Sequence, residues 1–308
     1  MQELEYFIVD VFTDMALAGN PLAVVINSVE LSTQQMQSIA REFNLSETTF
    51  VQRRPAALEQ AEGVRVRIFT TKEELPFAGH PSLGTASVLR LNAPDTVVAG
   101  TVTLALNVGK VPVHFAADGL FGEMTQRDPE FGAELDPSEV AHLIGLALDD
   151  LDPTLPPQIV STGTAFAIVV LRSPQSLAQL NVNQQQATSW LCERGARWFF
   201  VLAPTGRQAP GFCARMQFNG GEDPATGSAA GCAICYLVAR GVVASGKQIH
   251  LRQGVEIARP SDLFLSAQLL VESALPQFDP SSSNLPRVTD VRVAGSTVFV
   301  AKGSLFLP

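Results

Sequence analysis

Residues 220–241 read GGEDPATGSAAGCAICYLVARG and place a polar, glycine-rich turn directly before an uninterrupted apolar run. The eleven residues that precede Arg240 carry no charge. A helix with one exposed face would show polar residues about every 3.6 positions, so this run predicts a helix that is buried on all sides. We expect Asp223 and Pro224 to form its entry and Gly241 to end it.

The turn before this helix is a candidate anion site. Backbone N–H groups near Gly227 and Ser228 would lack intrahelical partners and would carry the positive end of the helix dipole. A carboxylate or a phosphate suits such a position. The alternative is a tight packing corner, because a glycine-rich turn serves that purpose as well.

Length and charge narrow the class of protein. The 308 residues suffice for one large domain or for two domains of about 150 residues each. Apolar residues make up 46% of the chain, charged residues make up 17%, and the net charge is -9. This balance argues against nucleic acid and anionic membranes as partners. The N-terminus lacks the basic segment of a signal peptide and no apolar run reaches about 18 residues, so we expect a cytoplasmic protein.

Cys232 and Cys235 form a C-x-x-C pattern inside the expected helix. A redox motif needs an exposed sulfur at a helix start, and a zinc site needs two more ligands at suitable spacing, which the sequence does not show. We therefore expect the two thiols to be small apolar filler of a packed helix.

Two further helices are expected in the first half of the chain. Residues 31–44, LSTQQMQSIAREFN, predict an amphipathic helix with a capping box of Ser32 and Gln35. A Gly-His-Pro turn should then lead into an apolar helix over residues 82–91.

Glu47 and His80 are candidates for proton transfer. Glu47 lies in the strand-like segment NLSETTFV, where an ionised carboxylate is costly to bury, and such a site would suit a general base that both takes and gives a proton. The alternative is an edge-strand Glu that faces water. His80 has an ordinary pKa close to neutrality and could be a second proton carrier, or it could only cap a helix.

One pattern occurs twice along the chain. A strand that ends in Phe is followed by an acidic pair, a Pro-x-x-Gly segment and a helix of small residues. His80 leads the first copy and Asp223 leads the second, which lies 143 positions later (223 minus 80). Similarity at this spacing predicts two copies of one domain whose buried helices face each other across a cleft. The order of elements does not show regular βαβ alternation and favours the α+β class.

The chain resembles the PhzF-like family, named for an isomerase of phenazine biosynthesis and related in fold to diaminopimelate epimerase. The segments that carry the resemblance are DVFTDMALAGNPLAVV, NLSETTFV, ELPFAGHPSLGTA and GGEDPATGSAAG, in the family's order. The resemblance implies an α+β fold of two similar lobes, each a mixed β-sheet or barrel curled around a central α-helix. We expect the N-terminal lobe at 1–118, which strands of 288–308 could complete, and the C-terminal lobe at 119–287, with the active site in the cleft between them.

The resemblance also implies an activity and its residues. It implies an isomerase that uses no cofactor and no metal, acts on a small carboxylate-bearing substrate and forms a homodimer. Glu47 would shuttle a proton, and His80 and Asp223 would assist it and hold the substrate. The positions similar to substrate-binding residues of the family are Ser46, Gly79, Gly227 and Ser228.

Two departures leave the substrate open. Ser82 replaces the family's usual Thr, and Ala230 stands where a His is often found. The matching turns hold His80 and Asp223 and no Cys, which argues against a racemase with two thiols. The alternatives are a non-catalytic small-metabolite-binding protein with the same cleft, and an epimerase that uses the same residues.

Overall fold

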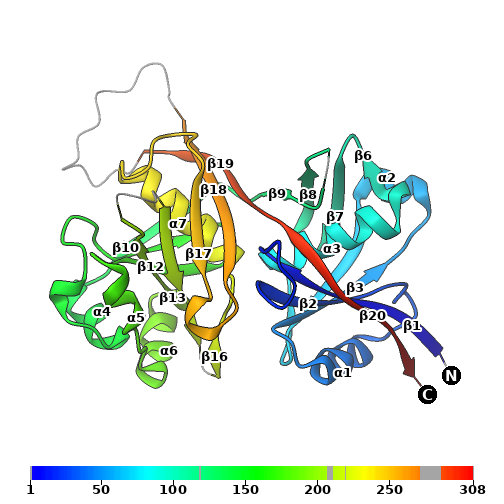
Figure 1. The fold of residues 1–308 in the computed structure, drawn as a ribbon, viewed down its shortest axis with the longest axis horizontal. Helices are drawn as coiled ribbons and strands as arrows, with labels where there is room; N and C mark the ends of the chain where they lie inside the picture. The colour runs from blue at the N-terminus through cyan, green and yellow to red at the C-terminus, as the bar shows by residue number, and fades with distance from the viewer. Residues whose placement is uncertain (1, 118, 207–210, 219, 271–285, 308) are drawn as a thin grey trace. The chain divides into compact units, whose positions relative to one another are not determined.

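The structure is a computed structural model that describes residues 2–117, 119–206, 211–218, 220–270 and 286–307. The chain forms two compact units (Figure 1). The first consists of Met1–Thr125, Arg259–Ser261 and Ala294–Pro308, and the second of Gln126–Ala258 and Asp262–Val293.

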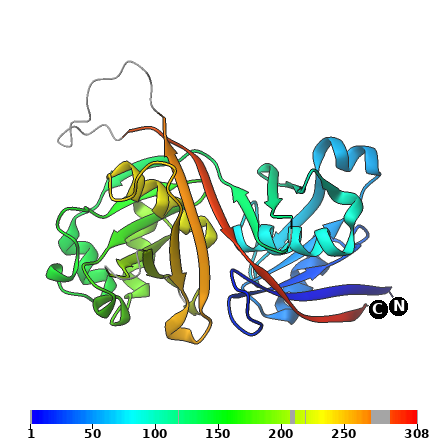
Figure 2. The ribbon, with the colours of Figure 1, turned by 45° about the horizontal axis from the view of Figure 1, so that its top comes forward.

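The first unit is a mixed β-sheet with α-helices. Its elements are β1 (Gln2–Val11), β2 (Asn20–Val25), α1 (Thr33–Phe43), β3 (Glu47–Gln52), α2 (Ala56–Glu62), β4 (Val64–Phe69), β5 (Glu74–Leu75), α3 (Gly79–Asn92), η1 (Pro94–Thr96), β6 (Val97–Val98), β7 (Thr101–Leu106), β8 (Gly109–Phe115), β9 (Gly122–Thr125) and β20 (Thr297–Leu307). The last strand, β20, pairs with β1 in antiparallel fashion from Thr297 to Leu307, with one shift of register between Ile8 and Val9 (Figure 2).

The second unit is also a mixed β-sheet with α-helices. Its elements are β10 (Glu130–Glu134), α4 (Pro137–Ile144), η2 (Leu148–Asp150), β11 (Gln158–Ser161), β12 (Ala165–Val170), α5 (Pro174–Ala178), α6 (Gln184–Glu193), β13 (Trp198–Pro204), β14 (Gly211–Arg215), β15 (Gln217–Phe218), β16 (Gly221–Glu222), α7 (Gly227–Ala239), β17 (Ile249–Gln253) and η3 (Val255–Ile257), followed by β18 (Ser261–Leu269) and β19 (Val288–Gly295).

Strand pairing follows one order in both units. In the first, β1–β2 is antiparallel, β2–β3 parallel, β3–β4 antiparallel and β4–β7 parallel. In the second, β11–β12, β12–β13, β13–β14 and β14–β17 repeat the same four directions. The prediction of two similar lobes of the α+β class is confirmed.

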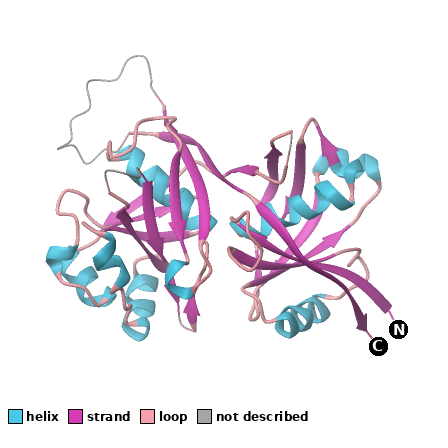
Figure 3. Cartoon of the chain, viewed as in Figure 1, coloured by secondary structure: helices cyan, strands magenta, loops and turns pink. Residues whose placement is uncertain are grey.

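One helix lies inside the strands of each unit, α3 in the first and α7 in the second (Figure 3). The residues of α3 from Gly79 to Leu89 are all buried. In α7 every residue except Ser228 is buried, and Gly241 follows with a positive φ of 71°. The predicted helix that is buried on all sides, with its end at Gly241, is therefore confirmed.

The starts of these helices differ from the prediction. Helix α3 begins at Gly79 and not at Ser82, because Pro81 lies in the first turn, where its missing N–H is not needed. Helix α7 begins at Gly227 after the N-cap Thr226, so Asp223 and Pro224 lie outside it.

The spacing of the internal repeat is corrected accordingly. The helix starts lie 148 positions apart (227 minus 79). Two matching ion pairs show the same offset, since Arg67–Glu74 in the first unit corresponds to Arg215–Glu222 in the second. The repeat is real, but the offset of 143 drawn from the Pro-x-x-Gly segments is wrong by five residues.

The expectations for α1 and for the two thiols are confirmed. Helix α1 has the capping box of Ser32 with Gln35, and its apolar face is buried. Both Cys232 and Cys235 are fully buried in α7. Burial raises the pKa of Cys232 to about 11 and raises that of Cys235 as well, so both stay as thiols.

None of the helices in the described parts of the chain is long and apolar enough to cross a membrane.

Candidate active site

Three polar side chains meet at the start of α3 in the first unit. Strands β2 and β3 run parallel, with Leu22 opposite Glu47, so Asn20 and Glu47 lie at the same edge of the sheet. His80 lies in the first turn of α3 beside this edge. Its Nδ1 is 3.1 Å from Asn20 Nδ2, and its Nε2 is 3.4 Å from Glu47 Oε2.

Burial decides the protonation of His80. The residue is 4% exposed, and the loss of hydration lowers its pKa to about 3. The imidazole is therefore neutral at pH 7, and the expectation that its pKa lies near neutrality is wrong. The Asn20 amide nitrogen can only donate, so Nδ1 accepts and the ring proton is on Nε2, the nitrogen that lies 3.4 Å from Glu47 Oε2.

Glu47 is held in an interior strand. Strand β3 pairs with β2 on one side and with β4 on the other, so the alternative of an edge-strand Glu that faces water is wrong. The side chain of Glu47 is 16% exposed. The Glu47 carboxylate is thus partly accessible, and its Oε2 lies 3.4 Å from His80 Nε2.

Two of the expected substrate-binding positions adjoin this pair. Ser46 directly precedes Glu47 and is half-buried. Gly79 is the first residue of α3 and is buried. The first-turn N–H groups of a helix have no intrahelical partners, so Gly79 lies where the backbone can bind an anion.

The remaining expected residues lie in the second unit. Asp223 is half-buried, and its Oδ2 accepts a hydrogen bond from Thr226 Oγ1 at 2.7 Å. Gly227 and Ser228 are the first two residues of α7. The carbonyl oxygen of Gly227 accepts from Gln126 Nε2 at 2.8 Å, which fixes the first turn of the helix.

Sequence reasoning missed three residues that hold these groups. Asn20 lies in the segment DVFTDMALAGNPLAVV and Thr226 lies in the segment GGEDPATGSAAG. A search of these segments for amides and hydroxyls could have found both. Gln253 is fully buried and bonds to both Asp223 and Thr226, although it lies at the end of β17. No local pattern marks it.

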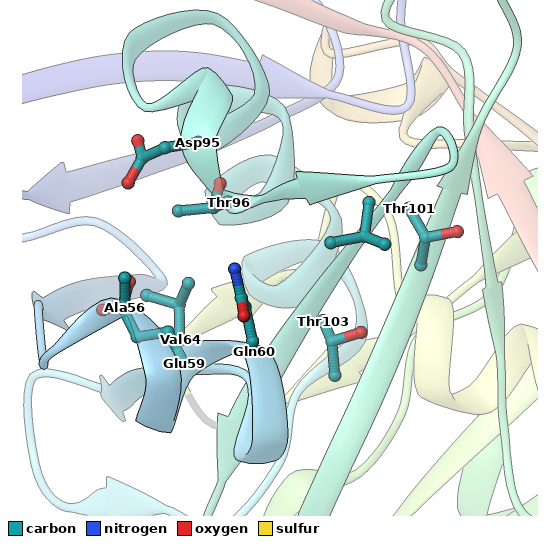
Figure 4. A pocket seen from close by; sticks show the side chains of 9 residues that line it. Ala56, Glu59, Gln60, Val64, Asp95, Thr96, Thr101 and Thr103 are labelled. Carbon is teal, nitrogen blue, oxygen red and sulfur yellow. The ribbon is translucent and has the colours of Figure 1, made fainter.

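A surface pocket of the first unit lies elsewhere. It has a volume of about 290 Å³ and is formed by α2, η1 and β7 (Figure 4). Glu59 at its wall is bound by Arg53 Nε and by the backbone N–H of Arg54. Neither Glu47 nor His80 lines it, and the charge of Glu59 is satisfied within the protein.

Comparison with known proteins agrees with the fold and shows the family. The chain matches the family described as phenazine biosynthesis-like protein over residues 9–303. A trans-2,3-dihydro-3-hydroxyanthranilate isomerase of Pseudomonas aeruginosa is 33% identical over 307 residues, which are 98% of this chain and 99% of that protein.

Two solved structures share the fold over the full length. A protein of Pseudomonas aeruginosa described as a predicted epimerase superposes with a TM-score of 0.79 at 32% identity, covering 99% of this chain and 100% of that one. A phenazine biosynthesis protein of the PhzF family from Bacillus anthracis superposes with a TM-score of 0.84 at 24% identity, covering 100% of both chains.

Proposed function

The chain belongs to the phenazine biosynthesis-like protein family, and we propose that it is a cofactor-independent isomerase that moves a proton on a small carboxylate substrate. One observation carries the proposal: Glu47 Oε2 lies 3.4 Å from Nε2 of a buried, neutral His80. A carboxylate beside a fixed hydrogen-bond donor is suited to general acid/base catalysis.

Glu47 would carry the proton. Its carboxylate takes a proton from a carbon next to an activating group, and the electron pair of the broken C–H bond moves into that group. Glu47 then returns the proton to a different carbon, so that no electrons leave the substrate and no oxidant is needed.

His80 would act as a hydrogen-bond donor and not as an imidazolium acid. Its low pKa keeps the ring neutral, and Asn20 keeps the proton on Nε2. This N–H group can donate to the Glu47 carboxylate before proton transfer, or to a substrate oxygen on which charge develops.

The remaining predicted residues are part of the same proposal. Asp223 would orient the substrate and relay protons, and the half-buried Ser46 would bind the substrate. The starts of α3 and α7, at Gly79 and at Gly227 with Ser228, would bind a carboxylate through backbone N–H groups.

The decisive experiment measures turnover of trans-2,3-dihydro-3-hydroxyanthranilate, the compound for which the isomerase of Pseudomonas aeruginosa is named. Wild type, Glu47→Gln and the control Glu42→Gln, an exposed residue of α1, are compared in deuterated buffer. We expect turnover with deuterium in the product, a loss of about 100-fold or more in kcat for Glu47→Gln, and little change for Glu42→Gln.

Other outcomes would assign a different function. Deuterium at an inverted but otherwise unchanged carbon would indicate an epimerase, which the relative described as a predicted epimerase makes the second candidate. Equal turnover by wild type and Glu47→Gln would contradict the proposed role of Glu47. Saturable binding of small carboxylates without turnover would indicate a binding protein.

Assembly and location complete the proposal. We propose a cytoplasmic homodimer, which sedimentation would detect as twice the chain mass of 32.9 kDa. A monomeric mass at micromolar concentration would contradict the dimer.

A further inference from the structure

A closed set of hydrogen bonds surrounds the turn between Asp223 and α7. Gln253 is fully buried, and its Nε2 donates to the carbonyl oxygen of Asp223 at 2.7 Å and to Thr226 Oγ1 at 2.9 Å. Its Oε1 accepts from the backbone N–H of Thr226 at 3.0 Å. Thr226 Oγ1 in turn donates to Asp223 Oδ2 at 2.7 Å. One amide therefore holds both ends of the turn.

The direction of each bond follows from the chemistry of the groups. A backbone N–H can only donate, so Thr226 N must meet Oε1 of Gln253, and a carbonyl oxygen can only accept, so Asp223 O must meet Nε2. With both protons of Nε2 used, Thr226 Oγ1 is an acceptor toward Gln253. Its own proton is then directed to the carboxylate of Asp223.

We infer that Gln253 and Thr226 are positioning residues for Asp223. Gln253 fixes the rotation of the Thr226 hydroxyl, and this hydroxyl fixes the plane of the Asp223 carboxylate. The inference rests on the proposed function, in which Asp223 takes part in the reaction. Gln253 and Thr226 would set the geometry of that carboxylate without touching the substrate.

The strength of the Thr226–Asp223 hydrogen bond agrees with a positioning role. A hydrogen bond to a charged group is stronger than a bond between neutral groups. A displacement of about 1 Å in a reacting group can lower a rate by about 100-fold. Removing one hydroxyl can therefore change the reaction without unfolding the protein.

The first test does not depend on turnover. Proton NMR of threonine-labelled protein measures how fast the Thr226 hydroxyl proton exchanges with water, and the signal is assigned by its loss in Thr226→Val. We expect slow exchange in the wild type and exchange faster by about tenfold or more in Gln253→Met, which keeps the length of the side chain and removes its hydrogen bonds.

The control is another buried amide of the same unit. Gln158 is 4% exposed, and its side chain donates to Gly132 O and accepts from Arg240. Gln158→Met should leave the exchange of the Thr226 hydroxyl unchanged. Equal exchange in wild type and Gln253→Met would overturn the role of Gln253.

The second test is a double-mutant cycle on the substrate that the wild type converts. We expect Thr226→Val to lower kcat by about tenfold with little change in KM, and Thr226→Ser, which keeps the hydroxyl, to restore kcat to within about twofold of the wild type. In the Asp223→Asn background Thr226→Val should have no further effect, because its partner has changed.

The outcomes separate this inference from the proposed function. A full effect of Thr226→Val in the Asp223→Asn background would show that Thr226 acts by some other route. If the wild type converts no substrate, the proposed function fails, while the exchange measurement still decides whether Gln253 fixes the hydroxyl.

Discussion

At the scale of single residues, the candidate site depends on the protonation state that burial gives to His80. His80 would titrate near neutrality in water, but inside the first unit it has lost its hydration and has a pKa of about 3. A neutral imidazole with one nitrogen bound by Asn20 has a single donor left, and this Nε2 lies 3.4 Å from Glu47 Oε2. The proposed chemistry therefore depends on a tautomer as much as on a charge.

The low pKa of His80 predicts a dependence of stability on pH. The unfolded chain takes up this proton near the ordinary value of 6.5, and the folded chain only near 3. The contribution of neutral His80 to stability is therefore fully present above pH 6.5. It is lost progressively as the pH falls from 6.5 toward 3. Between pH 7.5 and 5 we expect His80 to account for a loss of about 2 kcal/mol in the free energy of unfolding.

Urea unfolding of wild type and His80→Gln at both pH values measures this contribution. Gln cannot take up a proton, so the difference between pH 7.5 and pH 5 should be smaller in the variant by about this amount. The same difference in both proteins would mean that His80 titrates alike in the folded and unfolded chain.

At the scale of elements, the two central helices carry small residues because they lie against strands on several sides. Helix α3 packs on β1, β2, β3, β7 and β8. A Cβ atom at Gly84 would lie 2.7 Å from Leu22 Cδ2 and 2.7 Å from Val11 Cγ2, both on fully buried side chains. Glycine at this position lets the helix approach the sheet.

Gly84→Ala should therefore destabilise the protein. In an exposed helix this change would stabilise by up to about 1 kcal/mol through helix propensity. Here the added methyl group must displace two buried side chains, and we expect a net loss of about 1–3 kcal/mol. Thermal unfolding of Gly84→Ala measures the sign.

The matched control is Ser38→Ala on the exposed face of α1. This variant should be unchanged or more stable by up to about 0.5 kcal/mol, because only propensity acts there. A Gly84→Ala protein as stable as the wild type would show that α3 does not need glycine for its approach to β1 and β2.

At the scale of the whole molecule, the first unit is assembled from distant parts of the chain. Arg259, which follows more than a hundred residues of the second unit, donates to Gly19 O at 2.9 Å and to Asp10 Oδ1 at 2.6 Å. These contacts hold the chain directly before Asn20. The C-terminal strand β20 pairs with β1 from Val11 with Thr297 to Gln2 with Leu307.

This assembly predicts the effect of a truncation. Removal of residues 296–308 leaves β1 without its pairing to β20. It also exposes the core cluster that contains Leu4, against which Leu305 and Leu307 pack. We expect the first unit to lose protection from hydrogen exchange in β1 to β4, while β11 to β14 of the second unit keep theirs. Mass spectrometry of exchanged peptides measures both.

The control for the truncation is Phe306→Ser, which changes a residue of β20 that is 62% exposed. It keeps the backbone pairing and should leave the exchange of both units unchanged. Native protection of β1 to β4 in the truncated chain would show that β20 is dispensable for the first unit.

The sequence by itself determined the elements whose signals are local. The apolar run before Arg240 required a buried helix because it has no polar face, and Ser32 with Gln35 marked the start of α1. Repetition along the chain also predicted two similar lobes. These features depend on neighbouring residues or on long periodic patterns, which can be read without knowing the contacts.

Only the tertiary structure decided which backbone and side-chain groups find partners. The starts of α3 and α7 depend on the first-turn environment, and the repeat offset derived from the motifs was wrong for that reason. The low pKa of His80 depends on burial, and the bonds of Gln253 to Thr226 join residues 27 positions apart. Burial and long-range pairing arise from the packing of the whole chain, so no local pattern contains them.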